Sequence, residues 1–310
     1  MTFNKVSTTN EVLEGIRLDG KHAIITGATG GLGIETARAL ASVGASVTIT
    51  GRSSEKIEAA LETLRKEVPE ALFDGKLIDL ACLSSIRGTA SDMVAVGRPI
   101  DLLINNAGVM MTPEGKTADG FEMQFGTNHL GHFALTAGLM PIIAECGRVI
   151  TLSSGAHLRG SVDLDDLNWE SRDYDPNLAY AQSKTANAWF ALELHRRYSD
   201  RLLAFSVHPG VIETDLMRHL PKTLFDTMRE AIKRDGVEEK TVEQGAATSV
   251  WAATAPELTQ HGGSYLADCQ IAKPVTSEDP RNGHAPWAYD VEGAKRLFVV
   301  SETLTRVRFP

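Results

Sequence analysis

The sequence predicts an α/β fold: one doubly wound domain built on a mostly parallel, seven-stranded sheet. Short and nearly continuous apolar runs alternate with segments of helical periodicity along most of the chain, as in parallel sheets covered on both faces. The first apolar run ends in a cluster of glycines that opens a helix. The 310 residues are 43% hydrophobic and 23% charged, which is ordinary for a globular protein with a large core.

Strands and helices are expected in turn from residue 21, after a polar lead-in at 1–20 with a short helix at 10–15. The predicted strands occupy residues 22–26, 45–50, 76–80, 101–105, 148–152, 202–207 and 264–267. The predicted helices follow the glycines at 27–33 and then occupy residues 54–68, 84–96, 120–140, 180–198, 242–255 and 290–302. Ser84 has the side chain expected of a helix N-cap. This alternation leaves no second core, so residues 21–310 are expected to form one domain.

Two long stretches interrupt the alternation. Residues 155–177 form an acidic insertion, and residues 212–240 are rich in Met, Leu, Arg and Lys. Both leave the sheet at the carboxyl ends of predicted strands, where open α/β sheets bind ligands. We therefore expect both stretches to act as substrate loops.

Charge and cysteine content exclude several classes of function. The formal net charge of −9 argues against a partner that is nucleic acid or an anionic membrane. The three cysteines, Cys82, Cys146 and Cys269, form neither a disulfide framework nor a metal-ligand pattern, so no metal is expected. The N-terminus lacks the apolar segment of a signal peptide, and no apolar run reaches the ~18–20 residues of a membrane span. A soluble, cytoplasmic protein is predicted.

The glycine cluster has the pattern T-G-x-x-x-G-x-G at residues 26–33. Between a strand and a helix, such glycines let backbone N–H groups approach a pyrophosphate, although a tight turn alone would also use them. At the end of the second predicted strand stand Arg52 and Ser53, with no carboxylate before Glu55. An acidic residue at this position binds a ribose 2′-hydroxyl, whereas an arginine accommodates a 2′-phosphate. The pattern favours NADP(H) as cofactor; the plainer alternative is a solvated arginine at a strand end.

Tyr180 and Lys184 are four residues apart and lie on one face of a predicted helix. A nearby ammonium favours the phenolate, so Lys184 is expected to lower the pKa of Tyr180 toward the working pH. A tyrosine of that kind can act as general acid or base. The spacing alone is common on solvated helix faces.

Five motifs in order resemble the short-chain dehydrogenase/reductase (SDR) family. They are the glycine pattern at 26–33, N-N-A-G at 105–108, Ser153-Ser154, Tyr180-x-x-x-Lys184 and H-P-G at 208–210. The wording of YAQSKTAN and HPGVIETDL is similar to the branch of retinol dehydrogenases, WW-domain oxidoreductases and protochlorophyllide oxidoreductases. The resemblance implies a Rossmann-type domain.

The resemblance also implies the roles of individual residues. Tyr180 would be the general acid/base, Lys184 would lower its pKa and bond the nicotinamide ribose, Ser154 would hold the substrate oxygen, and Asn128 would anchor a water relay. The cofactor would be held by Gly27, Thr29, Gly30, Gly31, Leu32, Gly33, Arg52, Ser53, Asp79, Leu80, Asn106, Ala107, Gly108, Tyr180, Lys184, Pro209, Gly210, Ile212 and Thr214. Tyr180 follows Ser154 by 26 positions, about twice the usual family interval by the resemblance. The loop over the substrate pocket is therefore expected to be enlarged.

The expected activity is that of an NADP(H)-dependent alcohol dehydrogenase or carbonyl reductase whose substrate is a small apolar molecule. Reduction of a conjugated C=C bond and a non-catalytic NADP(H) sensor stay open as alternatives. The apolar side chains of the 180–198 helix would serve the core and, by analogy with the family, pairing in a homodimer or homotetramer.

Several other side chains have a plainer interpretation beside a functional one. His129 and His132 are expected to pack in the core or beside the cofactor and not to bind a metal. His157 and His219 would contact substrate or be solvated loop residues. Trp169, Tyr174, Leu216, Met217 and Leu220 would form an apolar substrate wall or pack within their own loops.

Overall fold

The computed structural model of the chain describes residues 3–212, 216, 230, 239–277 and 283–310. These residues build one sheet with the strand order β3-β2-β1-β4-β5-β6-β7-β8. All neighbouring strands are parallel except β7 and β8. The strands are β1 (His22–Ile25), β2 (Ser46–Gly51), β3 (Phe73–Leu77), β4 (Ile100–Asn105), β5 (Ile143–Leu152), β6 (Leu202–His208), β7 (Tyr265–Ala267) and β8 (Gln270–Ile271). The doubly wound fold is confirmed.

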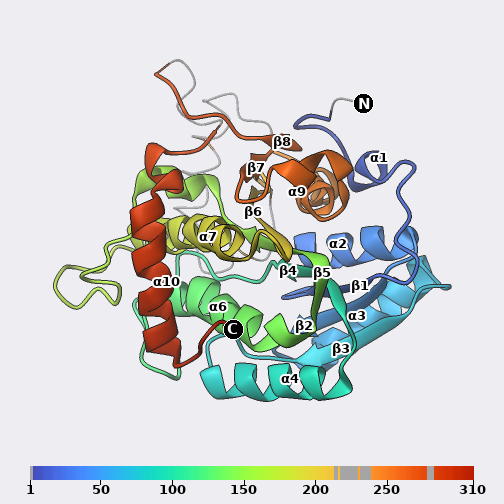
Figure 1. Ribbon diagram of the computed structural model, residues 1–310, viewed down its shortest axis with the longest axis horizontal. Coiled ribbons are helices and arrows are strands. Elements are labelled where there is room, and N and C mark those ends of the chain that lie inside the picture. Colours follow the sequence, from blue (N-terminus) through green and yellow to red (C-terminus); the bar gives the residue numbers. More distant parts are fainter. Residues whose placement is uncertain (1–2, 213–215, 217–229, 231–238, 278–282) are drawn as a thin grey trace.

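Helices cover both faces of the sheet (Figure 1). The α-helices are α1 (Thr9–Val12), α2 (Gly31–Ser42), α3 (Ser54–Glu67), α4 (Leu83–Val96), α5 (Met123–Phe125), α6 (Gly131–Leu139), α7 (Pro176–Tyr198), α9 (Val242–Thr254) and α10 (Val291–Thr305). One core lies between the sheet and α2, α3 and α9, and a second lies between the sheet and α4, α6 and α7. Neighbouring β1 residues alternate between them: Ala23 and Ile25 belong to the first core and Ile24 to the second. Among the described helices, none is both long and apolar enough to cross a bilayer.

The sheet has eight strands where the sequence predicts seven. Asp268 and Cys269 both adopt left-handed backbone conformations, with φ of 54°. Two successive residues of that kind form the tight turn that suits a two-residue hairpin, so β8 folds back antiparallel on β7. The turn carries no Asn-Gly or Asp-Gly pair, which is why the sequence pattern does not indicate it.

Several predicted boundaries move. Strand β3 begins at Phe73 and ends at Leu77, earlier than the predicted 76–80, and β5 begins at Ile143, five residues before the predicted start. Helix α4 is capped at Cys82 and not at Ser84. Helix α7 begins at Pro176, four residues before Tyr180, because the Asp175 side chain accepts hydrogen bonds from the first free amides of the helix.

Helix α10 covers the outer side of α7 and α6 (Figure 1). Phe298 of α10 packs edge-on against Phe133 of α6 at 4.9 Å between ring centres, and Phe309 packs against both. On α7, Trp189, Phe190 and Leu194 are consequently buried inside the chain. These side chains serve the core, and pairing as a homodimer or homotetramer stays a prediction.

The N-terminal lead-in is packed onto the domain. Val12 of α1 belongs to the first core. The Thr9 hydroxyl donates a hydrogen bond to the Glu35 carboxylate on α2, and Gln244 of α9 donates to the backbone carbonyl of Val6. Residues 6–12 therefore pack against both α2 and α9.

Candidate active site

The glycine turn between β1 and α2 is tightly folded against the end of β4. Gly27 and Gly31 have φ of 64° and 53°, a backbone region that favours glycine. A Cβ on Gly33 would lie 2.7 Å from both the Ala28 Cα and the Asn106 Nδ2. Gly30 is the N-cap of α2, and no side chain in the described part of the chain caps this helix. Because the first amides of a helix lack internal partners, this end suits a pyrophosphate.

The end of β4 is fixed to this turn through Thr26. The Thr26 hydroxyl accepts hydrogen bonds from the backbone N–H of Asn106 and Ala107 at 2.9 and 3.0 Å. The Asn106 side chain donates to the Thr26 carbonyl at 2.8 Å. Strands β1 and β4 flank the point where the strand order reverses, which is where doubly wound sheets bind nucleotides.

Arg52 lies beside the glycine turn with its side chain exposed. A Cβ on the preceding Gly51 would lie 2.8 Å from Thr29 Cγ2, which places the end of β2 against that turn. The Ser53 hydroxyl is already used: it caps α3 by accepting from the Lys56 N–H and donates to Glu55. Of the two predicted 2′-phosphate ligands, Arg52 is exposed, whereas the Ser53 hydroxyl is already hydrogen-bonded to residues of α3.

Asp79 and Leu80 follow β3. Asp79 is half-buried, and its carboxylate accepts a hydrogen bond from the Ala81 N–H at 2.9 Å. Leu80 is buried, and its carbonyl lies where a Cβ on Gly131 would come. Their predicted contact with the adenine stays a prediction.

Asn128 lies in a π-helical turn, Gly126–Leu130, between α5 and α6. Its side-chain oxygen accepts from the Val109 N–H at 2.8 Å. Its side-chain nitrogen donates to the Val109 carbonyl and to the Ser183 hydroxyl, which in turn donates to the Tyr180 carbonyl. Asn128 therefore joins the strip after β4 to helix α7.

Lys184 is buried beneath Tyr180. Its Nζ donates to the Leu152 carbonyl at 3.0 Å and lies 5.5 Å from the centre of the Tyr180 ring. A Cβ on Gly108 would lie 3.7 Å from this nitrogen and 3.2 Å from Asn128 Oδ1. Segment 106–108 thus lies against the glycine turn at one end, and its Gly108 lies beside Asn128 and Lys184 at the other.

The expected lowering of the Tyr180 pKa by Lys184 is wrong for this structure. Burial raises the pKa of Tyr180 to about 12, although a hydrogen bond from the Ser154 hydroxyl and the charge of Arg159 lower it in part. Burial also lowers the pKa of Lys184 to about 8. Both shifts have one cause, because a buried site disfavours the charged form of each group.

The two serines after β5 have separate tasks. The Ser153 hydroxyl donates to the Lys184 carbonyl at 2.8 Å and is buried. Ser154 is half-buried, and its hydroxyl faces Tyr180 and accepts from the Ala156 N–H at 3.2 Å. Ser154, and not Ser153, has its hydroxyl beside Tyr180, and its contact with a substrate oxygen stays a prediction.

Residues 208–212, at the end of β6 and just after it, lie against the segment that follows β5. His208 Nδ1 accepts hydrogen bonds from the N–H groups of Gly155 and Gly210, at 3.1 and 3.4 Å. Pro209 and Gly210 are half-buried, and Ile212 packs against Gly245 at the start of α9 near Leu32. Thr214 lies outside the described residues. His208 is a site residue whose contacts the sequence did not indicate.

His129 and His132 pack in the core, as predicted. His129 Nε2 lies 2.9 Å from the Ser301 hydroxyl of α10. His132 Nδ1 lies 2.9 Å from the Asn128 carbonyl, and its Nε2 lies 2.8 Å from the Thr26 hydroxyl. Burial lowers their pKa values to about 3 and about 4, so both are neutral. The described residues contain no group of three side chains that could hold a metal ion.

Insertion 155–177 packs its own aromatic side chains. The Arg172 guanidinium lies 3.8 Å from the centre of the Trp169 ring, and Tyr174 contacts the same ring. The Tyr174 hydroxyl donates to the buried Glu122 carboxylate at 3.0 Å. The insertion is thus anchored beside α5. Of the other side chains considered for a substrate wall, Leu216 is half-buried, whereas Met217, His219 and Leu220 lie outside the described residues.

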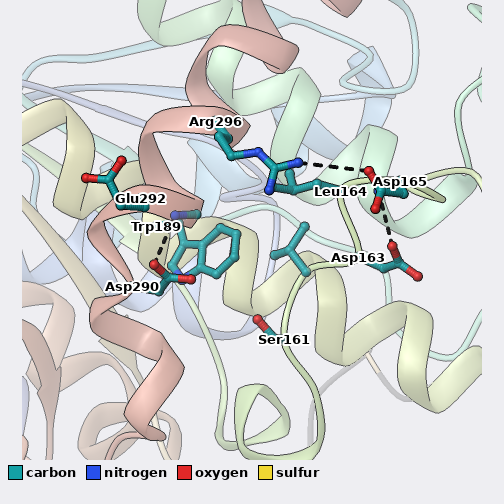
Figure 2. Close-up of a pocket in the computed structure, with 10 residues that line it drawn as sticks. Ser161, Asp163, Leu164, Asp165, Trp189, Asp290, Glu292 and Arg296 are labelled. Carbon is teal, nitrogen blue, oxygen red and sulfur yellow. Dashed lines mark hydrogen bonds and ion pairs between the residues drawn. The ribbon is translucent and has the colours of Figure 1, made fainter.

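A cleft of about 330 Å³ lies between the insertion and α10 (Figure 2). Asp163, Asp165, Asp290 and Glu292 line it, and Arg296 reaches to 3.9 Å from Asp165. None of the predicted catalytic or cofactor residues lines this cleft. It is a separate surface feature.

Comparisons with known proteins identify the family of this chain. The family described as short chain dehydrogenase matches residues 21–224. Polyprenol dehydrogenase of Mus musculus is 41% identical over 280 residues, covering 87% of this chain and 82% of the relative. Retinol dehydrogenase 13 of Homo sapiens is 39% identical over 299 residues, covering 94% and 87%. A crystal structure of an uncharacterized protein from Mycobacterium Paratuberculosis superposes with a TM-score of 0.76 and 36% identity, over 98% of this chain and 99% of that one.

Proposed function

This chain belongs to the short-chain dehydrogenase family, and we propose that it is an NADP(H)-dependent oxidoreductase acting on the alcohol or carbonyl group of a small apolar substrate. One observation carries the proposal. Segment 106–108 lies against the glycine turn at one end, and at Gly108 it lies beside Asn128 and Lys184, next to Tyr180 and Ser154. The proposed nucleotide-binding turn and the proposed proton donor would thus lie at the two ends of one short segment.

The chain's own residues would handle the proton and the substrate oxygen. With a pKa of about 12, Tyr180 is protonated at neutral pH and is set to donate its proton to a carbonyl oxygen. The Ser154 hydroxyl would donate a second hydrogen bond to the same oxygen, so that charge developing there is stabilised. When bound, the nicotinamide supplies the group that gives or takes the hydride. The protonated form of Tyr180 is the form that takes part in reduction, and the phenolate would take part in oxidation.

Arg52 supports NADP(H) over NAD(H). Its guanidinium is exposed beside the glycine turn, and the neighbouring acidic side chain, Glu55, accepts a hydrogen bond from Ser53. The substrate class follows from the relatives: polyprenol and retinol, which two of them are named for, are both apolar alcohols. We propose the aldehyde or alcohol form of such a compound as substrate.

The test is a turnover assay of the wild-type protein and of Tyr180→Phe. Both are incubated with NADPH or NADH and a panel of apolar aldehydes, alcohols and enones. Wild-type turnover with NADPH on aldehydes is expected, with loss of at least about 100-fold in Tyr180→Phe, because general acid catalysis contributes that much. Tyr198→Phe, which removes a hydroxyl that donates to the Pro310 carbonyl, is the matched control and should stay active. Turnover confined to enones would indicate C=C reduction, and none with any substrate would indicate a non-catalytic sensor.

A further inference from the structure

The backbone carbonyl of Ser154 accepts hydrogen bonds from three donors: the backbone N–H of His157 at 3.1 Å, the His157 ring and the distant Tyr265 side chain. His157 Nδ1 lies 2.7 Å from this carbonyl, and the Tyr265 hydroxyl donates to it at 3.1 Å. Ala285 donates its N–H to His157 Nε2 at 3.0 Å, so Nε2 is the acceptor nitrogen of the ring. Nδ1 therefore carries the proton and donates to Ser154. The ring is buried and neutral, because burial lowers its pKa to about 4.

The side chains of His157 and Tyr265 are themselves held by the C-terminal segment 284–289. The Trp287 indole donates to the His157 carbonyl at 2.9 Å. The Tyr289 hydroxyl accepts from the Tyr265 N–H at 2.8 Å. The Trp287 carbonyl in turn accepts from the Trp189 indole of α7 at 2.6 Å. Segment 284–289 therefore fixes His157 and Tyr265 from the side opposite Ser154.

We propose that His157 is a positioning residue that fixes the position of Ser154 relative to Tyr180. It does so because it hydrogen-bonds to the Ser154 carbonyl on one side and to segment 284–289 on the other. The proposal rests on the proposed function, because it concerns the serine that would hold the substrate oxygen. Ser154 is the second residue after β5 and the N-cap of the short helix Gly155–Arg159, so its backbone lies just beyond the regular sheet ladder. A misplacement of about 1 Å in such a group can cost about 100-fold in rate.

The two ring nitrogens can be tested separately. In His157→Asn the side-chain amide falls at the place of Nδ1 and can still donate to Ser154, but the partner of Ala285 is lost. In His157→Gln the amide oxygen falls at the place of Nε2 and can still accept from Ala285, but the donor to Ser154 is lost. His22→Gln is the matched control. His22 is also buried and its ring contacts Pro99 and Thr48, but it is the first residue of β1 and lies at the end away from the glycine turn.

Steady-state kinetics give the first measurement. His157→Gln is expected to lower kcat about tenfold with KM for NADPH within about twofold, whereas His157→Asn should lose less than about threefold. In a Ser154→Ala background, His157→Gln should cost less than about twofold, because the group that it positions is gone. Equal losses in both His157 variants, or an unchanged tenfold loss without the Ser154 hydroxyl, would overturn the proposal.

Amide hydrogen exchange gives a measurement that does not depend on turnover. Exchange at Ala285 should accelerate in His157→Asn more than in His157→Gln, and equal exchange would overturn the link to segment 284–289. If the proposed function itself is wrong, the wild-type protein will be inactive, which is a different result from an active wild type with unaffected His157 variants. An active wild type, an inactive Tyr180→Phe and an unaffected His157→Gln would refute the positioning role alone.

Discussion

Replacing Lys184 by Met should stabilise the protein while it abolishes turnover. The pKa of Lys184 falls from its ordinary 10.5 to about 8 because the ammonium is buried. At about 1.4 kcal/mol for each pKa unit, the charged form costs about 3 kcal/mol of folding free energy at pH 7. Met fills a similar volume with an unbranched apolar chain.

The hydrogen bond to Leu152 reduces this gain. Lys184 Nζ donates to the Leu152 carbonyl, and its loss should cost about 1 kcal/mol. The same carbonyl keeps a second donor, the Asn187 side chain at 2.9 Å. The expected net gain at pH 7 is therefore about 2 kcal/mol.

The gain should depend on pH in a defined direction. Between about pH 8 and 10.5 the unfolded chain binds more protons at Lys184 than the folded chain, so the wild type becomes more stable as pH rises through this window. At pH 10 the penalty has fallen to about 1 kcal/mol, which the lost hydrogen bond offsets. The two proteins should then be about equally stable.

Urea unfolding followed by circular dichroism, at pH 7 and at pH 10 without nucleotide, measures both differences. Lys66→Met, at an exposed position on α3, controls for removal of a lysine charge. If Lys184→Met is no more stable than the wild type at pH 7, or if its advantage is the same at both pH values, the assignment of a buried, costly ammonium is refuted.

Two further predictions concern the nucleotide cradle. Arg52→Glu should lower kcat/KM for NADPH by about 10- to 100-fold and leave kcat/KM for NADH unchanged or higher. The reason is that a hydrogen bond to a charged group contributes about 1.5–3 kcal/mol. If the ratio of kcat/KM for NADPH to that for NADH is unchanged, Arg52 does not bind a 2′-phosphate. Gly33→Ala should abolish NADPH binding measured by fluorescence titration, because the new Cβ would lie 2.7 Å from the Ala28 Cα. Gly88→Ala, where a Cβ on helix α4 meets nothing within 4 Å, should bind normally and gain about 0.5–1 kcal/mol of stability; normal binding by Gly33→Ala would contradict the tight turn.

Local features of the chain predicted most of the fold. Apolar runs and helical periodicity are properties of neighbouring residues, so they indicated seven of the eight strands and every long helix of the described part. Strand β8 was missed because the left-handed turn at Asp268 and Cys269 is set by the packing around it and not by the usual turn residues. The early start of β5 was missed because it also depends on packing between distant residues: Ile143 pairs with Ile100 of β4, and the strand register shifts after that pair.

The site was predictable where a residue type indicates its own chemistry. Tyr180, Lys184 and Ser154 do meet, but the direction of the Tyr180 pKa shift depends on burial, which no spacing between two residues reveals. The contacts of His157 with Tyr265 and Ala285 join positions more than 100 residues apart, and no local pattern marks them. Such contacts exist only after the chain has folded around them.

The cover that α10 places on α6 and α7 has a consequence for synthesis on the ribosome. Phe133 and Phe190 emerge long before Phe298 and Phe309, the aromatic rings that bury them. At about 5–20 residues per second, the nascent chain exposes these rings to water for roughly 5–35 s before their partners are made. Chaperone demand should peak during that interval. A chain stopped before Phe298 would be an aggregating fragment and not a smaller enzyme.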